Sequence, residues 1–262
     1  MSGVLRALVL AVAVALALST PADAQRGRRF NWMSGDASPI DYDGRVVIVR
    51  LWYPHYPGWS YDYPEMEQNL TLILKDVSAL RMHPDGSNIF RMDDPELLHF
   101  PVAYLSEPGY WYPTPTEAEG LRTYLQKGGF LWVDDFWGSA AWENWSREIS
   151  RVLPPAEYPM FDIPLTHPIM HTVYDVKDFL QVSAISFWYS SGGQVSERGR
   201  DSAEVHYRGI QDSHGRLMVL STHNTDVADT WEREGESAEY FNLFSPRGYA
   251  IGVNVVLYAL TH

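Results

Sequence analysis

Cysteine is absent from this chain of 262 residues. Without a thiol, structural disulfides, thiol catalysis and a lipid anchor on cysteine are all excluded. Basic residues are scarce as well, because 20 Lys and Arg stand against 33 Asp and Glu and the formal net charge is −13. Recognition of nucleic acid needs a basic face, so this charge argues against a nucleic-acid partner and against docking on anionic lipid.

Several catalytic signatures are missing too. The sequence has no Gly-x-Ser-x-Gly elbow, no phosphate-binding loop, no His-Glu-x-x-His pair and no Gly-x-Gly-x-x-Gly turn. Serine-hydrolase, nucleotide-binding and zincin chemistry are therefore without their usual motifs. Aromatic residues, in contrast, make up 14% of the chain, with 10 Trp and 16 Tyr. They indicate a Tyr- and Trp-rich core, an exposed aromatic surface for sugar rings or peptides, or both.

The N-terminus has the pattern of a secretory signal peptide over residues 1–24. Arg6 supplies a positive charge, an apolar run covers 7–18, and the tripeptide 22–24 has the small residues of a cleavage site. The run is shorter than the ~20 residues that span a bilayer. We therefore predict export to the periplasm or the extracellular space, with no membrane span after cleavage. The alternative is an uncleaved anchor, which the three arginines within 26–29 favour.

Beyond the signal, residues 25–44 are typical of an extended polar arm, and 45–262 of a single α/β domain. Short apolar runs alternate there with helical periodicity, which predicts a mostly parallel sheet with helices on both faces. A hairpin around residues 212–215 is predicted as an addition. The predicted strands are 45–51, 100–105, 130–133, 204–210 and 216–221, with 180–189 extended. The predicted helices begin near Asp62, at a Thr116–Glu119 capping box, near Ser139 and at Tyr249.

The segment from Gly128 to Gly138 is the most informative of the chain. Gly128 ends a helix, residues 130–133 form a short buried strand, and Asp134 and Asp135 follow where that strand ends. In an open α/β sheet the carboxyl ends of the strands face the crevice where ligands bind. If the chain turns there, both carboxylates face the crevice and form an acid/base pair. The alternative is that one caps the following helix while the other is solvated.

A set of short motifs gives the chain a family resemblance. They are Leu121 to Leu125, Gly128 to Leu131 with Asp134-Asp135, His167-Pro168-Ile169, Asn224-Thr225-Asp226 through Trp231-Glu232, and Gly252 to Thr261. With these motifs the chain resembles the bacterial domain-of-unknown-function family 4159 over residues 46–262. The resemblance implies a flavodoxin-like three-layer sandwich with a mostly parallel sheet, of the class I glutamine amidotransferase-like superfamily.

The chain departs from that superfamily at the nucleophile. Glutamine amidotransferases place a cysteine on a tight turn after a strand, whereas Asp134 or Asp135 stands at the comparable strand end here. Amidotransferase chemistry is therefore excluded, and membership of the family implies no activity of its own.

Acids and aromatics gather in four loops predicted at the carboxyl edge of the sheet: 53–63, 107–113, 134–142 and 223–232. Carboxylates hold hydroxyls or cations, and aromatic faces take sugar rings or cationic groups. The candidate ligand-binding residues are Tyr61, Asp62, Trp111, Trp137, Asp229, Trp231 and Glu232.

His223 and Asp226 are the candidate ligands of a divalent metal, because imidazole nitrogen and carboxylate oxygen both bind such ions. The alternative is structural, since Asp226, Asp229 and Glu232 would also favour the positive end of a following helix. No other cofactor is indicated by the sequence.

Two functions are consistent with these features. The first, which we favour, is a non-catalytic binding or assembly module of the cell envelope whose partner is a glycan, a peptide or an envelope protein. The second is a periplasmic hydrolase that uses Asp134 or Asp135 as acid/base, with or without a metal.

Overall fold

The computed structural model describes residues 40–262, apart from the side chains of residues 85 and 86. The predicted signal peptide, 1–24, and residues 25–39 of the predicted arm lie outside the described residues. The described residues belong to one compact unit. Between residues 40 and 262, no helix is both long and apolar enough to cross a membrane.

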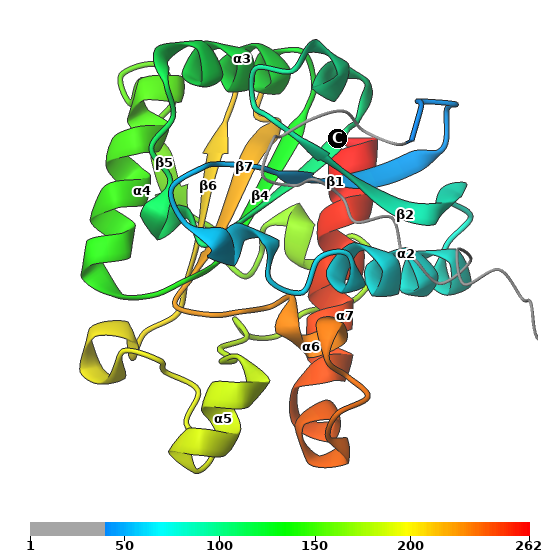
Figure 1. Cartoon of the computed structure of the whole chain (residues 1–262), viewed down its shortest axis with the longest axis vertical. Coiled ribbons are helices and arrows are strands. Elements are labelled where there is room, and N and C mark those ends of the chain that lie inside the picture. Colours follow the sequence, from blue (N-terminus) through cyan, green and yellow to red (C-terminus); the bar gives the residue numbers. More distant parts are fainter. Residues whose placement is uncertain (1–39) are drawn as a thin grey trace, which may run out of the picture. The chain divides into compact units, whose positions relative to one another are not determined.

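A seven-stranded sheet in the order β2-β1-β3-β4-β7-β6-β5 forms the centre of the fold (Figure 1). Strands β2, β1, β3, β4 and β7 are parallel, whereas β6 and β5 run antiparallel to their neighbours. The strands are β1 (Val46–Leu51), β2 (Met82–Phe90), β3 (Val102–Ser106), β4 (Phe130–Phe136), β5 (Met160–Asp162), β6 (His206–Gln211) and β7 (Leu217–His223). The predicted α/β architecture and the β6–β7 hairpin are thus confirmed.

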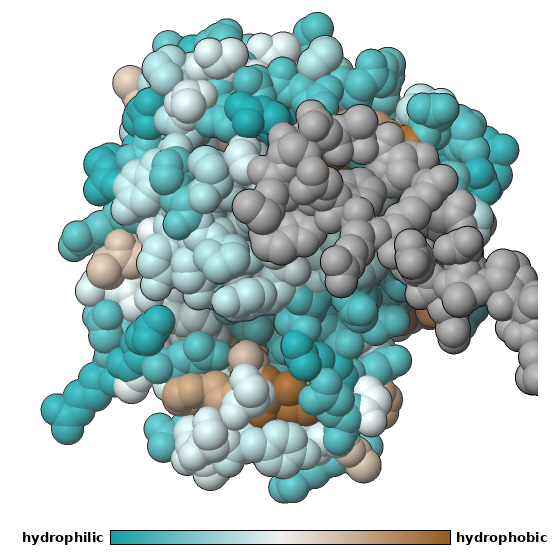
Figure 2. Space-filling view, in the orientation of Figure 1, coloured by the Kyte–Doolittle hydropathy of each residue, from teal (hydrophilic) through white to brown (hydrophobic). Residues whose placement is uncertain are grey.

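Helices cover both faces of this sheet, α2 and α7 on one and α3 and α4 on the other (Figure 1). Tyr104 and Trp132 share a buried cluster with Leu70 of α2 and Ile251 of α7, while strand neighbours such as Leu105 point to the opposite face. The helices are α2 (Glu65–Val77), α3 (Pro115–Gln126), α4 (Gly138–Val152), α5 (Ile185–Ser191), α6 (Asp229–Glu232) and α7 (Ala238–Thr261). Figure 2 shows a largely hydrophilic face, with apolar side chains gathered toward the lower end, in the region of α5.

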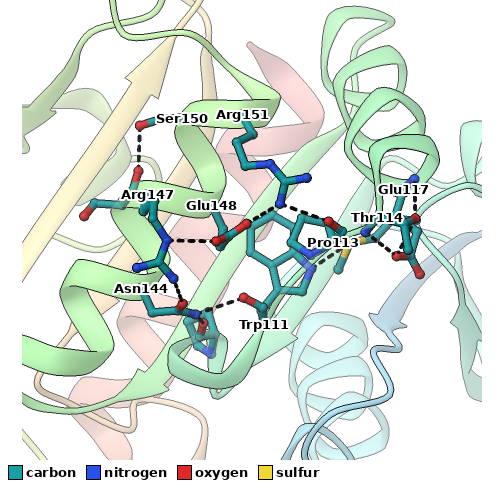
Figure 3. Close-up of polar contacts among 12 residues, drawn as sticks. Trp111, Pro113, Thr114, Glu117, Asn144, Arg147, Glu148, Ser150 and Arg151 are labelled. Atoms are coloured by element: carbon teal, nitrogen blue, oxygen red, sulfur yellow. Dashed lines mark hydrogen bonds and ion pairs between the residues drawn. The ribbon is translucent and has the colours of Figure 1, made fainter.

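The capping box of α3 differs from the predicted one. Thr114 accepts a hydrogen bond from the backbone N–H of Glu117, and the Glu117 carboxylate accepts from the backbone N–H of Thr114 (Figure 3). The predicted Thr116–Glu119 box is wrong, although its spacing is the same. Pro115 decides between them, because proline is favoured at the first helical position and its missing N–H costs nothing there.

The segment 180–189, predicted as extended, contains the start of α5. Its β-branched and aromatic residues favour a strand by composition. Ile185 and Trp188 lie one helical turn apart, and both are buried in the core cluster. Gly192 then ends the helix in the left-handed conformation, with φ 75°. Packing against the core therefore overrides the local preference.

Further elements differ from the predictions, among them β2, β5 and α7. Strand β2 is not predicted, because Pro84, Asp85 and Gly86 within it are typical turn residues, which an edge strand tolerates. Helix α7 begins well before Tyr249, after the side chain of Ser237 caps its first turn. Pro246 lies inside α7, and because proline usually ends or breaks a helix, the sequence does not predict helix on its N-terminal side.

Candidate functional site

A cavity lies at the carboxyl ends of the parallel strands, where the strand order reverses between β1 and β3. Such a switch point is where open α/β sheets bind ligands. The cavity has a volume of about 310 Å³, which is in the range of small-molecule sites. Its lining residues are Tyr61, Asp62, Tyr104, Ser106, Glu107, Asp135, Ala184, Ser186, Glu197, Asp226, Asp229, Glu232 and Arg233.

Three of the lining carboxylates share an uncommon backbone conformation. Asp62, Glu107 and Asp135 have φ values of 57°, 55° and 55°, in the left-handed region that non-glycine residues rarely adopt. Asp62 precedes α2, whereas Glu107 and Asp135 lie at the ends of β3 and β4. Each such residue costs about 1 kcal/mol or more, and such costs gather at functional sites. The turns direct the three carboxylates into one cavity.

The adjacent Asp134 and Asp135 have different surroundings. Asp134 is fully buried and is not on the cavity lining. Its Oδ1 accepts from the hydroxyl of Thr222, and its Oδ2 accepts from the N–H of Ala228 at 3.0 Å and from the hydroxyl of Tyr104 at 3.4 Å. Burial raises the pKa of Asp134 to about 7. Asp134 therefore links β4 to β7 and to the loop before α6, and the cavity receives Asp135 alone.

This linkage predicts a stability difference between two substitutions. Asp134→Ala is expected to lower the free energy of unfolding by about 2–3 kcal/mol, because Ala228 and Thr222 lose their acceptor inside the fold. Asp134→Asn keeps a carbonyl oxygen at this position, so its loss is expected to be smaller by at least about 1 kcal/mol. Urea unfolding of both variants measures the difference. Equal losses in the two would contradict the proposed hydrogen-bonding role.

Asp135 remains available to a ligand on one side. Its Oδ1 accepts from the indole N–H of Trp137 at 3.0 Å. Burial raises its pKa well above the ordinary value, and the charges of Glu107 and Glu197 raise it further. Burial and the charge of Glu197 likewise raise the pKa of Glu107 to about 7. The charge of Glu197 thus opposes the ionisation of both Glu107 and Asp135.

The loop after β7 and α6 supply the rest of the acidic lining. Asp229 is 2% exposed, and its Oδ2 accepts from the N–H of Ile185 at 2.7 Å and from the hydroxyl of Tyr240 at 2.9 Å. Burial raises the pKa of Asp229 to about 6. Burial also raises the pKa values of Asp226 and Glu232 well above their ordinary values, and neighbouring acids add to both shifts.

The charge on this lining is strongly one-sided. Seven lining residues are Asp or Glu, and among the described residues of the lining Arg233 is the one basic side chain. Arg233 donates to Asp62, and its Nε lies 3.8 Å from Asp229 Oδ1. Because buried carboxylates need a proton or a cation, this arrangement suits a positively charged ligand.

One part of the lining has the geometry of a metal site. Asp62, Asp229 and Glu232 each offer an oxygen, and these oxygens lie within 4.8 Å of one another. Carboxylate oxygens at such separations can converge on a hard divalent cation. The metal candidates named from the sequence are not both at the cavity. Asp226 lines it, whereas the His223 ring packs on Phe136 and Trp142, with Nε2 at 3.1 Å from the carbonyl of Gly138.

The aromatic candidates are divided in the same way. Tyr61 lines the cavity and is 57% exposed. Trp111 and Trp231 are fully buried and Trp137 is 7% exposed, and none of the three is on the lining. Trp111 packs against Trp145, and its carbonyl accepts from Asn144 at the junction of α3 and α4 (Figure 3). The candidates Asp62, Asp229 and Glu232 all lie on the lining.

Several lining or supporting residues have no counterpart among the sequence candidates, including Tyr104, Glu197, Arg233 and Arg50. Tyr104 lies within a buried strand, and only its register shows that its side chain borders the cavity. Glu197 lies in a loop after α5 with no motif around it. The burial of Arg50, which is 1% exposed, has no sequence signal. The fold alone brings these residues together.

The fold and the cavity define an α/β protein with a mostly parallel sheet and an acidic crevice at its carboxyl edge. The family model of a domain of unknown function, DUF4159, matches residues 47–260, and the chain belongs to that family. No curated protein matches the sequence.

Proposed function

We propose that this chain is an exported, non-catalytic binding module whose acidic cavity takes a cationic group of its ligand. The observation that carries this proposal is the set of seven carboxylates around a cavity of about 310 Å³, with Arg233 as the basic residue among the described lining. Ionised carboxylates held away from water are costly unless a cation pairs with them. A positively charged ligand would supply that cation.

The fold supports a finer assignment, which we also propose. Five parallel strands in the order β2-β1-β3-β4-β7 follow the flavodoxin-like pattern 2-1-3-4-5. A flavodoxin-like sandwich of the class I glutamine amidotransferase-like superfamily is consistent with this order. The absence of cysteine separates the chain from the chemistry of that superfamily.

A group of tyrosines that includes Tyr61 of the lining supports a partner with an exposed cationic group. The ring of Tyr56 stacks on that of Tyr110, with 4.1 Å between the ring centroids. The same ring meets that of Tyr61 edge-on, with 6.4 Å between the centroids. Aromatic faces attract ammonium and guanidinium groups. We therefore propose a glycan, a peptide or an envelope protein as the partner, and that the part entering the cavity is positively charged.

Thermal unfolding of the full chain tests the proposal. A panel of metal chlorides, organic amines and neutral sugars is compared at constant ionic strength. At a hundred times its dissociation constant, a bound cation adds about 2.7 kcal/mol to the stability, seen as a rise in Tm. Asp226→Asn is expected to abolish that rise, while Asp76→Asn on the exposed side of α2 preserves it. Stabilisation by neutral sugars with none by any cation would overturn the proposal.

A hydrolase remains the second candidate, with a changed acid/base pair. Both oxygens of Asp134 accept hydrogen bonds within the fold, so Asp135 with Glu107 replaces the pair Asp134 and Asp135. The specific observation in its favour is the raised pKa of Glu107, about 7, which burial and the charge of Glu197 cause. Turnover of a glycoside that Asp135→Asn abolishes, with binding retained, would favour this candidate.

A further inference from the structure

The cavity carboxylates fall into two groups by their counter-charges. The paired group is Asp62, Asp229 and Glu232, whose oxygens converge within 4.8 Å. Arg233 donates to Asp62 and approaches Asp229, so a guanidinium of the chain itself lies against this group. The unpaired group consists of the remaining lining acids: Glu107, Asp135, Glu197 and Asp226. Within residues 40–262, no Lys, Arg or His lies within ion-pair distance of the unpaired group. The charge of Arg198 acts from farther away on Glu107 and Glu197, and Asp135 and Asp226 have the least compensation.

Hydrogen bonds leave acceptors of the unpaired group open. Asp226 is 5% exposed, and its Oδ1 accepts from the backbone N–H of Asp229 at 3.1 Å. No described residue donates to its Oδ2, although Asp226 lines the cavity. Asp135 repeats the pattern, because Trp137 donates to its Oδ1 and no described residue to its Oδ2. Neither Oδ2 atom is enclosed within the protein, so a donor brought by a ligand can reach both and would add a charge-assisted hydrogen bond.

The arrangement of these acceptors favours an organic cation over a metal ion. A single ion needs several oxygens close enough to coordinate it at once. Among the described residues, three carboxylates converge in this way in the paired group, and the unpaired group forms no such set. Acceptors that do not converge on one point suit N–H donors that are carried at different points of a flexible chain. Arg233 already places one organic cation on the paired group.

We propose that the cavity binds a small aliphatic diamine, with one ammonium group on Asp226 and Asp135 of the unpaired group. The second ammonium group pairs with the paired group beside Arg233. This inference rests on the proposed cation-binding function and names the class of ligand. Tyr104 and Tyr61 are also on the lining, and aromatic rings there would attract an ammonium group.

Isothermal titration of the full chain tests this inference with 1,4-diaminobutane, spermidine, 1-aminobutane, MgCl2 and CaCl2, each at constant ionic strength. The diamine is expected to bind at least tenfold more tightly than the monoamine, because the second ammonium adds a charge-assisted hydrogen bond. Asp226→Asn, which keeps the acceptor for Asp229, is expected to weaken diamine binding at least tenfold. Asp76→Asn, at an exposed position of α2, is the matched control and is expected to leave the affinity unchanged.

The outcomes separate this inference from the proposed function. Saturable binding of Mg²⁺ or Ca²⁺ without binding of diamines would contradict the diamine inference but would agree with the proposed cation-binding function. Equal affinity for diamine and monoamine would also overturn the diamine inference. Absence of binding by every cation would remove the proposed function as well. If Asp226→Asn unfolds, Glu107→Gln in the same group provides the second variant, with the same tenfold loss expected.

Discussion

The free energy of unfolding is expected to fall as the pH rises through neutrality. Burial raises the pKa of Glu107 from 4.5 to about 7, and that of Asp134 from 3.8 to about 7. A carboxyl whose pKa is higher in the folded state binds more protons there than in the unfolded state. Stability therefore decreases with increasing pH between the unfolded and the folded pKa. Burial also raises the pKa values of Asp135, Asp226 and Glu232 well above their ordinary values, so these groups contribute to the same decrease.

Histidines oppose this trend at lower pH. Burial lowers the pKa of His223 from 6.5 to about 4, and burial also lowers the pKa values of His167 and His206. The unfolded state then binds more protons than the folded state below pH 6.5, so these groups make stability rise as the pH approaches 6.5. As the pH rises above 6.5 they become neutral in both states, and their opposing effect disappears. The decrease caused by the carboxyls is therefore cleanest above pH 6.5.

Urea unfolding at a series of pH values above 6.5 measures this effect. Each differently protonated group contributes at most about 1.4 kcal/mol per pH unit. Glu107 and Asp134, with folded pKa values of about 7, are together expected to give a fall of about 1–2 kcal/mol between roughly pH 6.5 and 8. Glu107→Gln is expected to flatten the profile, while Glu65→Gln, an exposed acid of α2, leaves it unchanged. A profile that is flat or rising above pH 6.5 would contradict the assignment of the acidic cavity.

Parts of the fold could be predicted because their signals are local. Gly128 has φ 108° after α3, as expected for a residue that ends a helix. The alternation of apolar runs with helical periodicity predicts the parallel sheet, and Asp212 to Gly215 predict the hairpin between β6 and β7. These features depend on a few neighbouring residues, so one sequence is enough to indicate them.

The different roles of Asp134, which is hydrogen-bonded inside the fold, and Asp135, which lines the cavity, could not be predicted. It depends on a register shift between β4 and β7 and on the left-handed φ of Asp135. Glu197 and Arg233 come to the cavity from segments distant in sequence from β4, and no short motif marks them. Contacts of this kind are set by tertiary packing. The acidic edge was therefore predictable as a region, whereas its members required the fold.

The buried ion pair between Arg50 and Glu67 contacts residues of the cavity lining. Breaking this pair is expected to be the most destabilising of the changes proposed. Their side chains are 1% and 0% exposed, with Arg50 Nε at 2.6 Å from Glu67 Oε1. Arg50 also donates to the carbonyls of Trp59 at 2.8 Å and Tyr61 at 3.3 Å. Its guanidinium lies 4.8 Å from the ring centroid of Tyr104. The pair thus connects α2 to two residues of the lining.

Glu67→Gln is expected to lower the free energy of unfolding by about 3–5 kcal/mol, because it leaves the guanidinium of Arg50 buried without its counter-charge. Glu65→Gln, exposed on the same helix, is expected to change it by less than about 0.5 kcal/mol. The double variant Arg50→Met/Glu67→Leu removes both charges and is expected to recover much of the loss. Urea unfolding measures all three. Because the double variant no longer holds the carbonyl of Tyr61, its affinity for cations should remain reduced even where its stability recovers. A double variant as unstable as Glu67→Gln would show instead that the hydrogen bonds of Arg50, rather than its charge balance, stabilise this region.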